Sequence, residues 1–142
     1  MTVEELAAVH ARAMETPASW GANDFKEMLA LPGVFCVVPP GQKRAGFALG
    51  RVVLEEAELL TLAVAPDMQR QGLGRACLNL FEEEARTLGA SRLHLEVAVT
   101  NKRAILLYTS NGWQECGRRK AYYAGASSRI DAVLMSKQVE RP

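Results

Sequence analysis

The stretch LAVAPDMQRQGLGR, residues 62–75, decides the fold of this chain. Its first part belongs to an almost continuous apolar run, 59–65, which suits a central strand covered on both faces. After the turn, apolar residues recur at helical spacing, and Gly89 follows where a C-terminal cap belongs. The segment therefore predicts a buried strand, a turn and a helix whose apolar face consists of Leu73, Cys77, Leu80, Phe81, Ala85 and Leu88.

The turn in this segment carries two glycines, Gly72 and Gly74, between Arg70 and Arg75. Glycine lets the backbone approach a ligand closely, the first amides of a helix lack partners, and the helix dipole attracts negative charge. The spacing fits neither a Walker loop nor a dinucleotide fingerprint. On these residues alone, a tight turn with solvated arginines is the alternative. The preceding strand and the following helix favour a pyrophosphate site.

The patterns on both sides of this segment predict the remaining elements. They are amphipathic helices over the first dozen or so residues and around 25–31, the latter capped by Asn23 or Asp24, strands at 34–38 and 45–54, a charged bend at 55–58, a strand at 92–99, a helix from the cap Asn101 to Gly112, and strands at 113–123 and 130–137. A strand–helix–strand unit implies a parallel pair, and hairpins imply antiparallel strands. We therefore predict an α/β (α+β) fold with a mixed central sheet flanked by helices on both faces.

Composition limits the size and class of the protein. A length of 142 residues allows one domain, 1–142, and 49% hydrophobic with 23% charged residues is typical of soluble globular proteins. A net charge of +1 attracts neither nucleic acid nor an anionic membrane, and no window is apolar enough for a membrane span. The three cysteines form no paired motif and read as buried small hydrophobes, and no histidine–carboxylate cluster is present. We expect a cytoplasmic protein without a catalytic metal.

The segment QRQGLG, residues 69–74, matches the Q/R-x-x-G-x-G/A motif of the GNAT superfamily of N-acetyltransferases. The resemblance extends over roughly residues 44–137 through LHLEV (93–97), Asn101, AILLY (104–108), NGW (111–113) and RRKAYY (118–123). In these segments the chain resembles the RimI-like branch, the ribosomal-protein-alanine acetyltransferases. The resemblance implies the GNAT fold and acetyl-CoA as co-substrate.

The resemblance also implies roles for individual residues. Glu96 is the expected general base and Tyr108 the expected general acid that meets the departing thiolate. The residues expected to hold acetyl-CoA are Leu62, Ala63, Val64, Arg70, Gln71, Gly72, Leu73, Gly74, Arg75 and Asn101. From the residues alone, Glu96 fits a solvated strand face, Tyr108 a core packing position and Asn101 a helix cap equally well.

The resemblance implies a protein N-terminal α-amine, such as that of a ribosomal protein, as the acceptor. An α-amine, with a pKa of about 7.7–8.0 against about 10.4 for lysine, also has more of its free form at neutral pH. The chain departs from the branch at Ala98 and Ala124, where arginine and proline are usual. The sequence therefore leaves open a small-molecule amine acetyltransferase and, from another class, a non-catalytic acyl-CoA-binding sensor.

The chain starts almost at its first predicted helix, whereas members of the resembled family normally begin with a strand. We therefore expect the sheet to lack that first edge strand, which leaves an edge open or covered by a partner. The expected state is a monomer or a weak homodimer.

Overall fold

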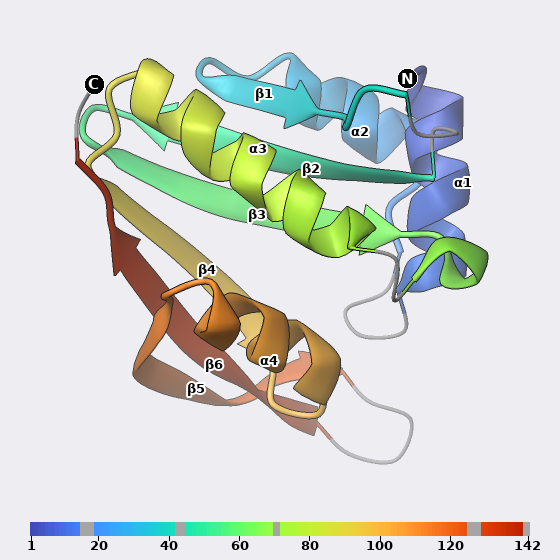
Figure 1. Cartoon of the computed structure of the whole chain (residues 1–142). Helices are drawn as coiled ribbons and strands as arrows, with labels where there is room; N and C mark the ends of the chain where they lie inside the picture. The colour runs from blue at the N-terminus through green and yellow to red at the C-terminus, as the bar shows by residue number, and fades with distance from the viewer. Residues whose placement is uncertain (15–18, 42–44, 70–71, 125–128, 141–142) are drawn as a thin grey trace.

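The computed structural model describes residues 1–14, 19–41, 45–69, 72–124 and 129–140. Its elements are α1 (Val3–Ala13), α2 (Ala22–Leu29), β1 (Val34–Val37), β2 (Gly46–Val53), β3 (Glu56–Val64), the 3-10 turn η1 (Pro66–Met68), α3 (Leu73–Thr87), β4 (Arg92–Ala98), α4 (Lys102–Ser110), β5 (Gln114–Ala124) and β6 (Arg129–Gln138). Within these ranges the strands form a mixed sheet in the order β1-β2-β3-β4-β6-β5 (Figure 1). The predicted α/β architecture is confirmed.

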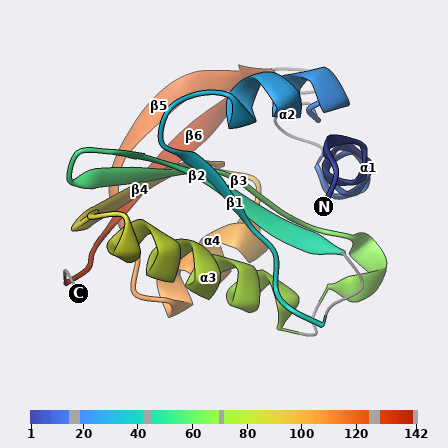
Figure 2. The same ribbon diagram turned by 90° about the horizontal axis from the view of Figure 1, so that it is seen from above.

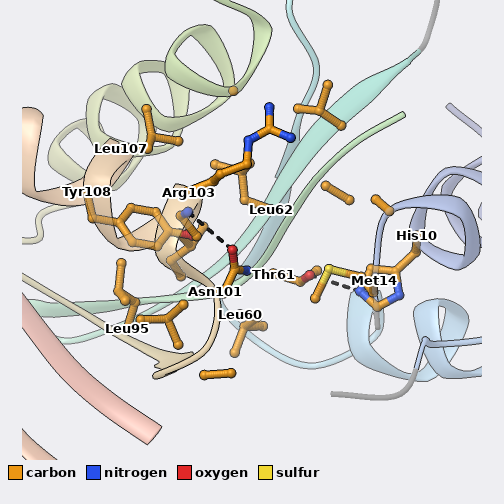
Figure 3. A pocket seen from close by; sticks show the side chains of 18 of the residues that line it. His10, Met14, Leu60, Thr61, Leu62, Leu95, Asn101, Arg103, Leu107 and Tyr108 are labelled. Atoms are coloured by element: carbon orange, nitrogen blue, oxygen red, sulfur yellow. Dashed lines mark hydrogen bonds between the residues drawn. The ribbon is translucent and has the colours of Figure 1, made fainter. Parts of the chain in front are cut away.

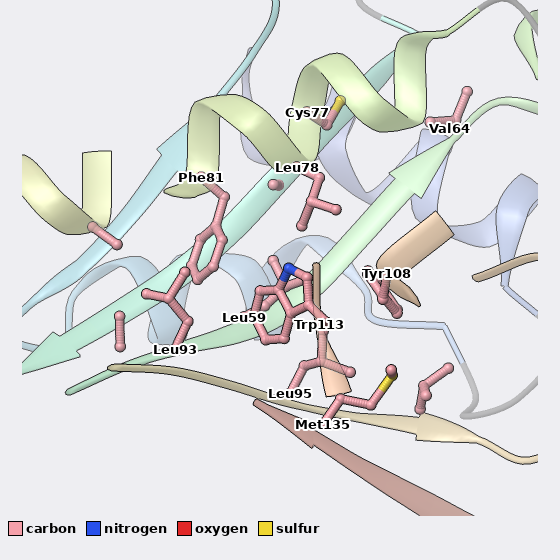
Figure 4. Close-up of a cluster of buried hydrophobic side chains, with 14 of the residues drawn as sticks. Leu59, Val64, Cys77, Leu78, Phe81, Leu93, Leu95, Tyr108, Trp113 and Met135 are labelled. Atoms are coloured by element: carbon pink, nitrogen blue, oxygen red, sulfur yellow. The ribbon is translucent and has the colours of Figure 1, made fainter. Parts of the chain in front are cut away.

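Helices cover both faces of the sheet, as predicted (Figure 2). On the face of α3 and α4, the alternate β4 residues Leu93 and Leu95 pack with Phe81 and Trp113 in the larger core cluster (Figure 4). On the opposite face, α1 and α2 contribute to a second cluster that includes Phe25. The sheet therefore separates two apolar layers, and a site that reaches through it has access to both.

The sheet opens between β3 and β4. Their parallel pairing consists of Glu56 with Arg92, Ala57 with Leu93 and Glu58 with His94, after which β3 pairs only with β2 and β4 only with β6. The register between β2 and β3 shifts so that Leu60 lies opposite no β2 residue. Such a bulge bends a strand. Because this one lies two residues beyond the last β3–β4 pair, it marks where the two strands part.

The charged bend predicted at 55–58 is wrong, because β3 begins at Glu56. Ala57 is buried between the exposed Glu56 and Glu58, so the alternation of a strand with one covered face starts three residues before the apolar run. The turn instead falls at Leu54, a non-glycine residue with a φ of 56°. This correction matters because residues 56–58 make the whole of the β3–β4 pairing.

The two N-terminal helices have well-defined starts. Thr2 caps α1, and its Oγ1 accepts the Glu5 amide at 3.1 Å. No strand precedes α1 in residues 1–14, as expected, and the short β1 forms that edge of the sheet. Neither predicted cap begins α2: its N-cap is Gly21, whose amide donates to Asp24 at 2.9 Å. The helix ends at Leu29, before the predicted end at residue 31.

Candidate active site

A cavity of about 700 Å³ lies where β3 and β4 part (Figure 3). It is bounded by both strands, α4, the start of α3 and the C-terminal part of α1. The predicted site residues that line it are Leu62, Ala63, Val64, Gly72, Gly74, Arg75, Glu96, Asn101 and Tyr108. Leu73 instead packs its side chain in the core. Arg70 and Gln71 lie outside the described residues.

The start of α3 is shaped by glycine. Gly72, the N-cap, has a φ of 79°, in the left-handed region that glycine adopts without strain, and provides no side chain to occupy the first helical amides. Neither α3 nor α4 has an acidic residue in its first turn. Arg75 and Arg103 stand there instead, although the helix dipole disfavours cations at an N-terminus. Both helix starts therefore present positive charge to the cavity, and the start of α3 also presents its uncapped amides, which suits a phosphate-bearing ligand.

The two arginines are held by hydrogen bonds. Arg75 donates to Ser110 Oγ at 2.8 Å and to Asn111 Oδ1 at 3.0 Å, which ties α3 to the end of α4. Arg103 donates to Gln69 Oε1 at 2.6 Å, and Gln69 in turn donates to the Val64 carbonyl at 3.1 Å. Sequence reasoning missed Arg103 and Gln69 as cavity residues. The signal that could have found Arg103 is a cation in the first turn of a helix.

Glu96 lies on the wall formed by β4. Its side chain is 23% exposed, and Oε1 lies 3.1 Å from Arg119 Nε. The Arg119 guanidinium in turn lies over the Tyr122 ring, 5.2 Å from its centroid. Burial and the charge of Glu96 raise the pKa of the nearby Glu58 carboxyl, and the same two causes raise the pKa of Tyr123 to about 12. Glu96 is therefore a cavity carboxylate rather than part of a freely solvated face.

Tyr108 and Asn101 approach the cavity from α4 (Figure 3). Tyr108 is buried, its ring lies 6.0 Å from that of Trp113, and burial raises the pKa of its phenol well above the ordinary value. The phenol therefore keeps its proton at neutral pH. Asn101 Oδ1 accepts the Ala104 amide at 3.2 Å, so the predicted helix cap is confirmed.

A buried carboxylate holds the end of α4. Glu82 of α3 accepts hydrogen bonds from Asn111 Nδ2 at 2.7 Å and Trp113 Nε1 at 3.0 Å, and forms an ion pair with Lys137 of β6. Lys137 also donates to the Asn111 carbonyl at 2.7 Å. This network joins three elements next to the turn of α4 that carries Tyr108.

His10 borders the other end of the cavity. It is 1% exposed, its Nδ1 accepts the Trp20 amide at 2.9 Å, and its Nε2 lies 3.0 Å from Thr61 Oγ1. Burial lowers the pKa of His10 to about 4. The ring is therefore neutral at neutral pH.

The low pKa of His10 predicts a loss of stability in mild acid. Because the His10 pKa falls from about 6.5 in the unfolded chain to about 4 in the folded one, only the unfolded chain takes up this proton between those values. This linkage lowers the free energy of unfolding by up to about 3 kcal/mol as the pH falls through that window. Urea denaturation of wild type and His10→Gln at pH 7.5 and pH 5 tests it. The variant should lose less stability on acidification, and an equal loss would contradict the assignment.

Other expectations concern metals, membranes and cysteines. Across the described ranges, no three His, Cys, Asp or Glu side chains gather as metal ligands, and no helix is long and apolar enough to cross a membrane. The cysteines are not all buried: Cys77 is, Cys36 is half-buried and Cys116 is exposed.

Comparison with known proteins identifies related chains. The model of the acetyltransferase (GNAT) family matches residues 5–113. [Ribosomal protein bS18]-alanine N-acetyltransferase of Escherichia coli (strain K12) is 47% identical over 94 residues, which are 66% of this chain and 64% of that protein. The matched segment thus spans less than two thirds of that relative. A putative enzyme of the same name from Bacillus subtilis (strain 168) is 29% identical over 94% of this chain and 87% of its own length.

Solved structures have the same fold. The crystal structure of the ribosomal-protein-S18-alanine N-acetyltransferase from Escherichia coli is 34% identical, with a TM-score of 0.87 over 99% of this chain and 89% of that one. The structure of Arabidopsis thaliana NAA60 in complex with acetyl-CoA has a TM-score of 0.82 at 17% identity, over 97% of this chain and 93% of that one. At that identity the likeness concerns the fold alone.

Proposed function

The chain belongs to the acetyltransferase (GNAT) family, and from that premise we propose that it transfers an acetyl group from acetyl-CoA to a protein N-terminal α-amine. The observation that carries the proposal is the gap between β3 and β4. A carboxylate, Glu96, and a buried phenol, Tyr108, both border this gap, beside Arg75 and the glycine turn that begins α3.

The residues at the α3 and α4 end of the cavity fit acetyl-CoA, which supplies an activated acetyl thioester when bound. The first amides of α3 at Gly72, Leu73 and Gly74 would hold its pyrophosphate. Arg75 and Arg103 would add positive charge. We also propose that Arg70 and Gln71 contribute to binding acetyl-CoA, and that Asn101 contacts the pantetheine arm of the same molecule.

The backbone of β3 offers donors for the reacting carbonyl. Strand amides point alternately to the two sides, and the side of residues 59–64 that faces β4 has no paired strand. Amides within Leu62, Ala63 and Val64 are therefore suited to stabilise negative charge that develops on an oxygen in the gap. Because the donors are fixed in the sheet, they need little rearrangement during the reaction.

The side chains of Glu96 and Tyr108 are proposed to act on the protons of the reaction. Glu96 would take a proton from the acceptor ammonium, directly or through a water. Tyr108 would meet the leaving sulfur. Even an ordinary phenol, with a pKa of about 10 against about 8.5 for a thiol, transfers its proton uphill by roughly 2 kcal/mol. Because burial raises the Tyr108 pKa further, a hydrogen bond to the sulfur is favoured over full proton transfer.

The relatives and the chemistry of amines support this class of acceptor. Two relatives are named for acetylating an alanine of ribosomal protein bS18, which supports a protein N-terminus, such as that of a ribosomal protein, as acceptor. At pH 7.5 an α-amine also has about two orders of magnitude more free base than a lysine side chain.

A panel of acceptors tests this function. Release of the CoA thiol is measured with a free-amine alanyl peptide, an N-blocked lysine peptide and a polyamine. We expect the alanyl peptide to be turned over fastest. A faster polyamine reaction would instead identify a small-molecule amine acetyltransferase, and binding of acetyl-CoA without turnover of any acceptor would identify a sensor.

A further inference from the structure

The directions of the hydrogen bonds around His10 leave the hydroxyl hydrogen of Thr61 without an acceptor. Because His10 Nδ1 accepts the Trp20 amide, the hydrogen of the neutral ring must be on Nε2. Nε2 therefore donates to Thr61 Oγ1, 3.0 Å away. The Thr61 oxygen is the acceptor in that bond, so the Thr61 hydroxyl hydrogen is free to point elsewhere.

That hydroxyl lies at the edge of the cavity. Thr61 lines the cavity and is only 8% exposed, and within the described part of the chain its hydroxyl makes no hydrogen bond other than the one with His10. A buried hydroxyl without an acceptor for its hydrogen carries a free-energy cost. A ligand oxygen at this position would remove that cost.

The position of Thr61 in the sheet indicates which ligand supplies the oxygen. Ala63, two residues along β3 and so on the same face, packs in the cluster of α1 and α2, whereas the alternate residues Leu62 and Val64 pack on the side of α3 and α4. Thr61 therefore faces away from the glycine turn proposed for acetyl-CoA. Because acetyl-CoA is proposed to occupy the side of α3 and α4, this side is the one left for the acceptor.

The neighbours of Thr61 indicate an uncharged oxygen. The cavity residues at this end are the neutral His10 and the uncharged Ala13, Met14 and Trp20 (Figure 3). Among the described lining residues at this end, a carboxylate would find no cation to pair with, which is costly in a buried site. A peptide carbonyl carries no such cost. In an N-terminal residue, one carbon separates the carbonyl group from the α-amine.

We propose that Thr61, oriented by His10, donates a hydrogen bond to the first peptide carbonyl of the acceptor, and that this bond selects α-amines of peptides over other amines. The inference rests on the proposed function. Thr61 is a specificity-determining residue, and His10 is a positioning residue that acts through it. A lysine side chain and a polyamine have no carbonyl at this distance from the amine.

The test compares two acceptors in the wild type and in a variant that lacks the Thr61 hydroxyl. One acceptor is an alanyl peptide, and the other is the same peptide with its first amide replaced by an alkene isostere, which keeps the shape but removes the carbonyl. The wild type should favour the peptide about tenfold in kcat/KM, the effect of one hydrogen bond. Thr61→Val, which keeps the side-chain shape, should lose that preference, mainly through a higher KM for the peptide. Thr61→Ser should keep it.

The outcomes separate this inference from the proposed function. If Thr61→Val slows both acceptors equally, Thr61 acts on the thioester or on folding, and the inference fails. It also fails if the wild type does not distinguish the two acceptors. If the wild type acetylates neither, the proposed function fails. Calorimetric binding of the peptide in the presence of CoA then still compares wild type with Thr61→Val, and equal affinities would overturn the inference.

Discussion

Glu96→Gln is expected to lower kcat/KM for an alanyl peptide by about 100- to 10,000-fold, the range for loss of a general base. Glutamine has nearly the same shape as glutamate but does not take the proton of the acceptor ammonium. The side chain is partly exposed and its ion pair with Arg119 is peripheral, so the fold should persist. Thiol release and thermal melting, measured together, separate catalysis from stability.

Two further variants sharpen this test. Tyr108→Phe removes the hydrogen-bond donor proposed for the leaving sulfur while it keeps the ring against Trp113. Glu56→Gln changes an exposed carboxylate on the same face of the sheet, outside the cavity lining, and serves as the matched control. Rates near the wild-type value for both Glu96→Gln and Tyr108→Phe would refute the catalytic assignment.

Lys137→Met is expected to lower the free energy of unfolding by about 3–5 kcal/mol, the cost of leaving a buried charge without its partner. The Glu82 side chain is only 11% exposed, and without Lys137 its charge is met only by the neutral donors Asn111 and Trp113. Urea denaturation at neutral pH measures the loss. Since the network adjoins the turn that carries Tyr108, turnover should fall before the protein unfolds globally.

The double variant Glu82→Gln/Lys137→Met distinguishes charge from packing. Its glutamine oxygen still accepts from Trp113 and Asn111, so most of the lost stability should return. The matched control is Arg12→Gln, which breaks the ion pair between Arg12 and Asp67. Because these side chains are 56% and 67% exposed, the variant should lower the free energy of unfolding by less than about 1 kcal/mol. A double variant as unstable as Lys137→Met would show that packing, not the unpaired charge, causes the loss.

Local patterns predicted most of the fold because their causes are local. The apolar run at 59–65, the glycine turn and the cap at Asn101 each depend on residues within one or two turns of one another. The predicted apolar face of α3 was less accurate. Leu80 is only half-buried and Leu88 is 47% exposed, whereas Leu78 and Glu82 are buried. The helical position of Glu82 does not reveal that Lys137, far along the chain, forms an ion pair with it.

The missed parts of the site depend on distant residues. His10 and Thr61 are 51 positions apart, and Glu82 and Lys137 are 55 apart. No periodicity in the sequence connects such pairs, so His10 is indistinguishable from a core histidine until α1 is placed on the sheet. The roles of Glu96 and Tyr108 came from resemblance to a family, since residue type and spacing alone fit a strand face and a core position.

The short pairing between β3 and β4 affects how the two parts of the sheet can move relative to each other. Two half-sheets, β1–β3 and β4–β6, are joined edge to edge through only three residue pairs. Because so few backbone pairs join them, we expect the half-sheets to rotate about this junction, with a displacement that grows along the strands toward Val64 and Ala98. A ligand bound between the half-sheets takes the place of the missing backbone pairs. Binding should therefore make the region around the gap between β3 and β4 more rigid.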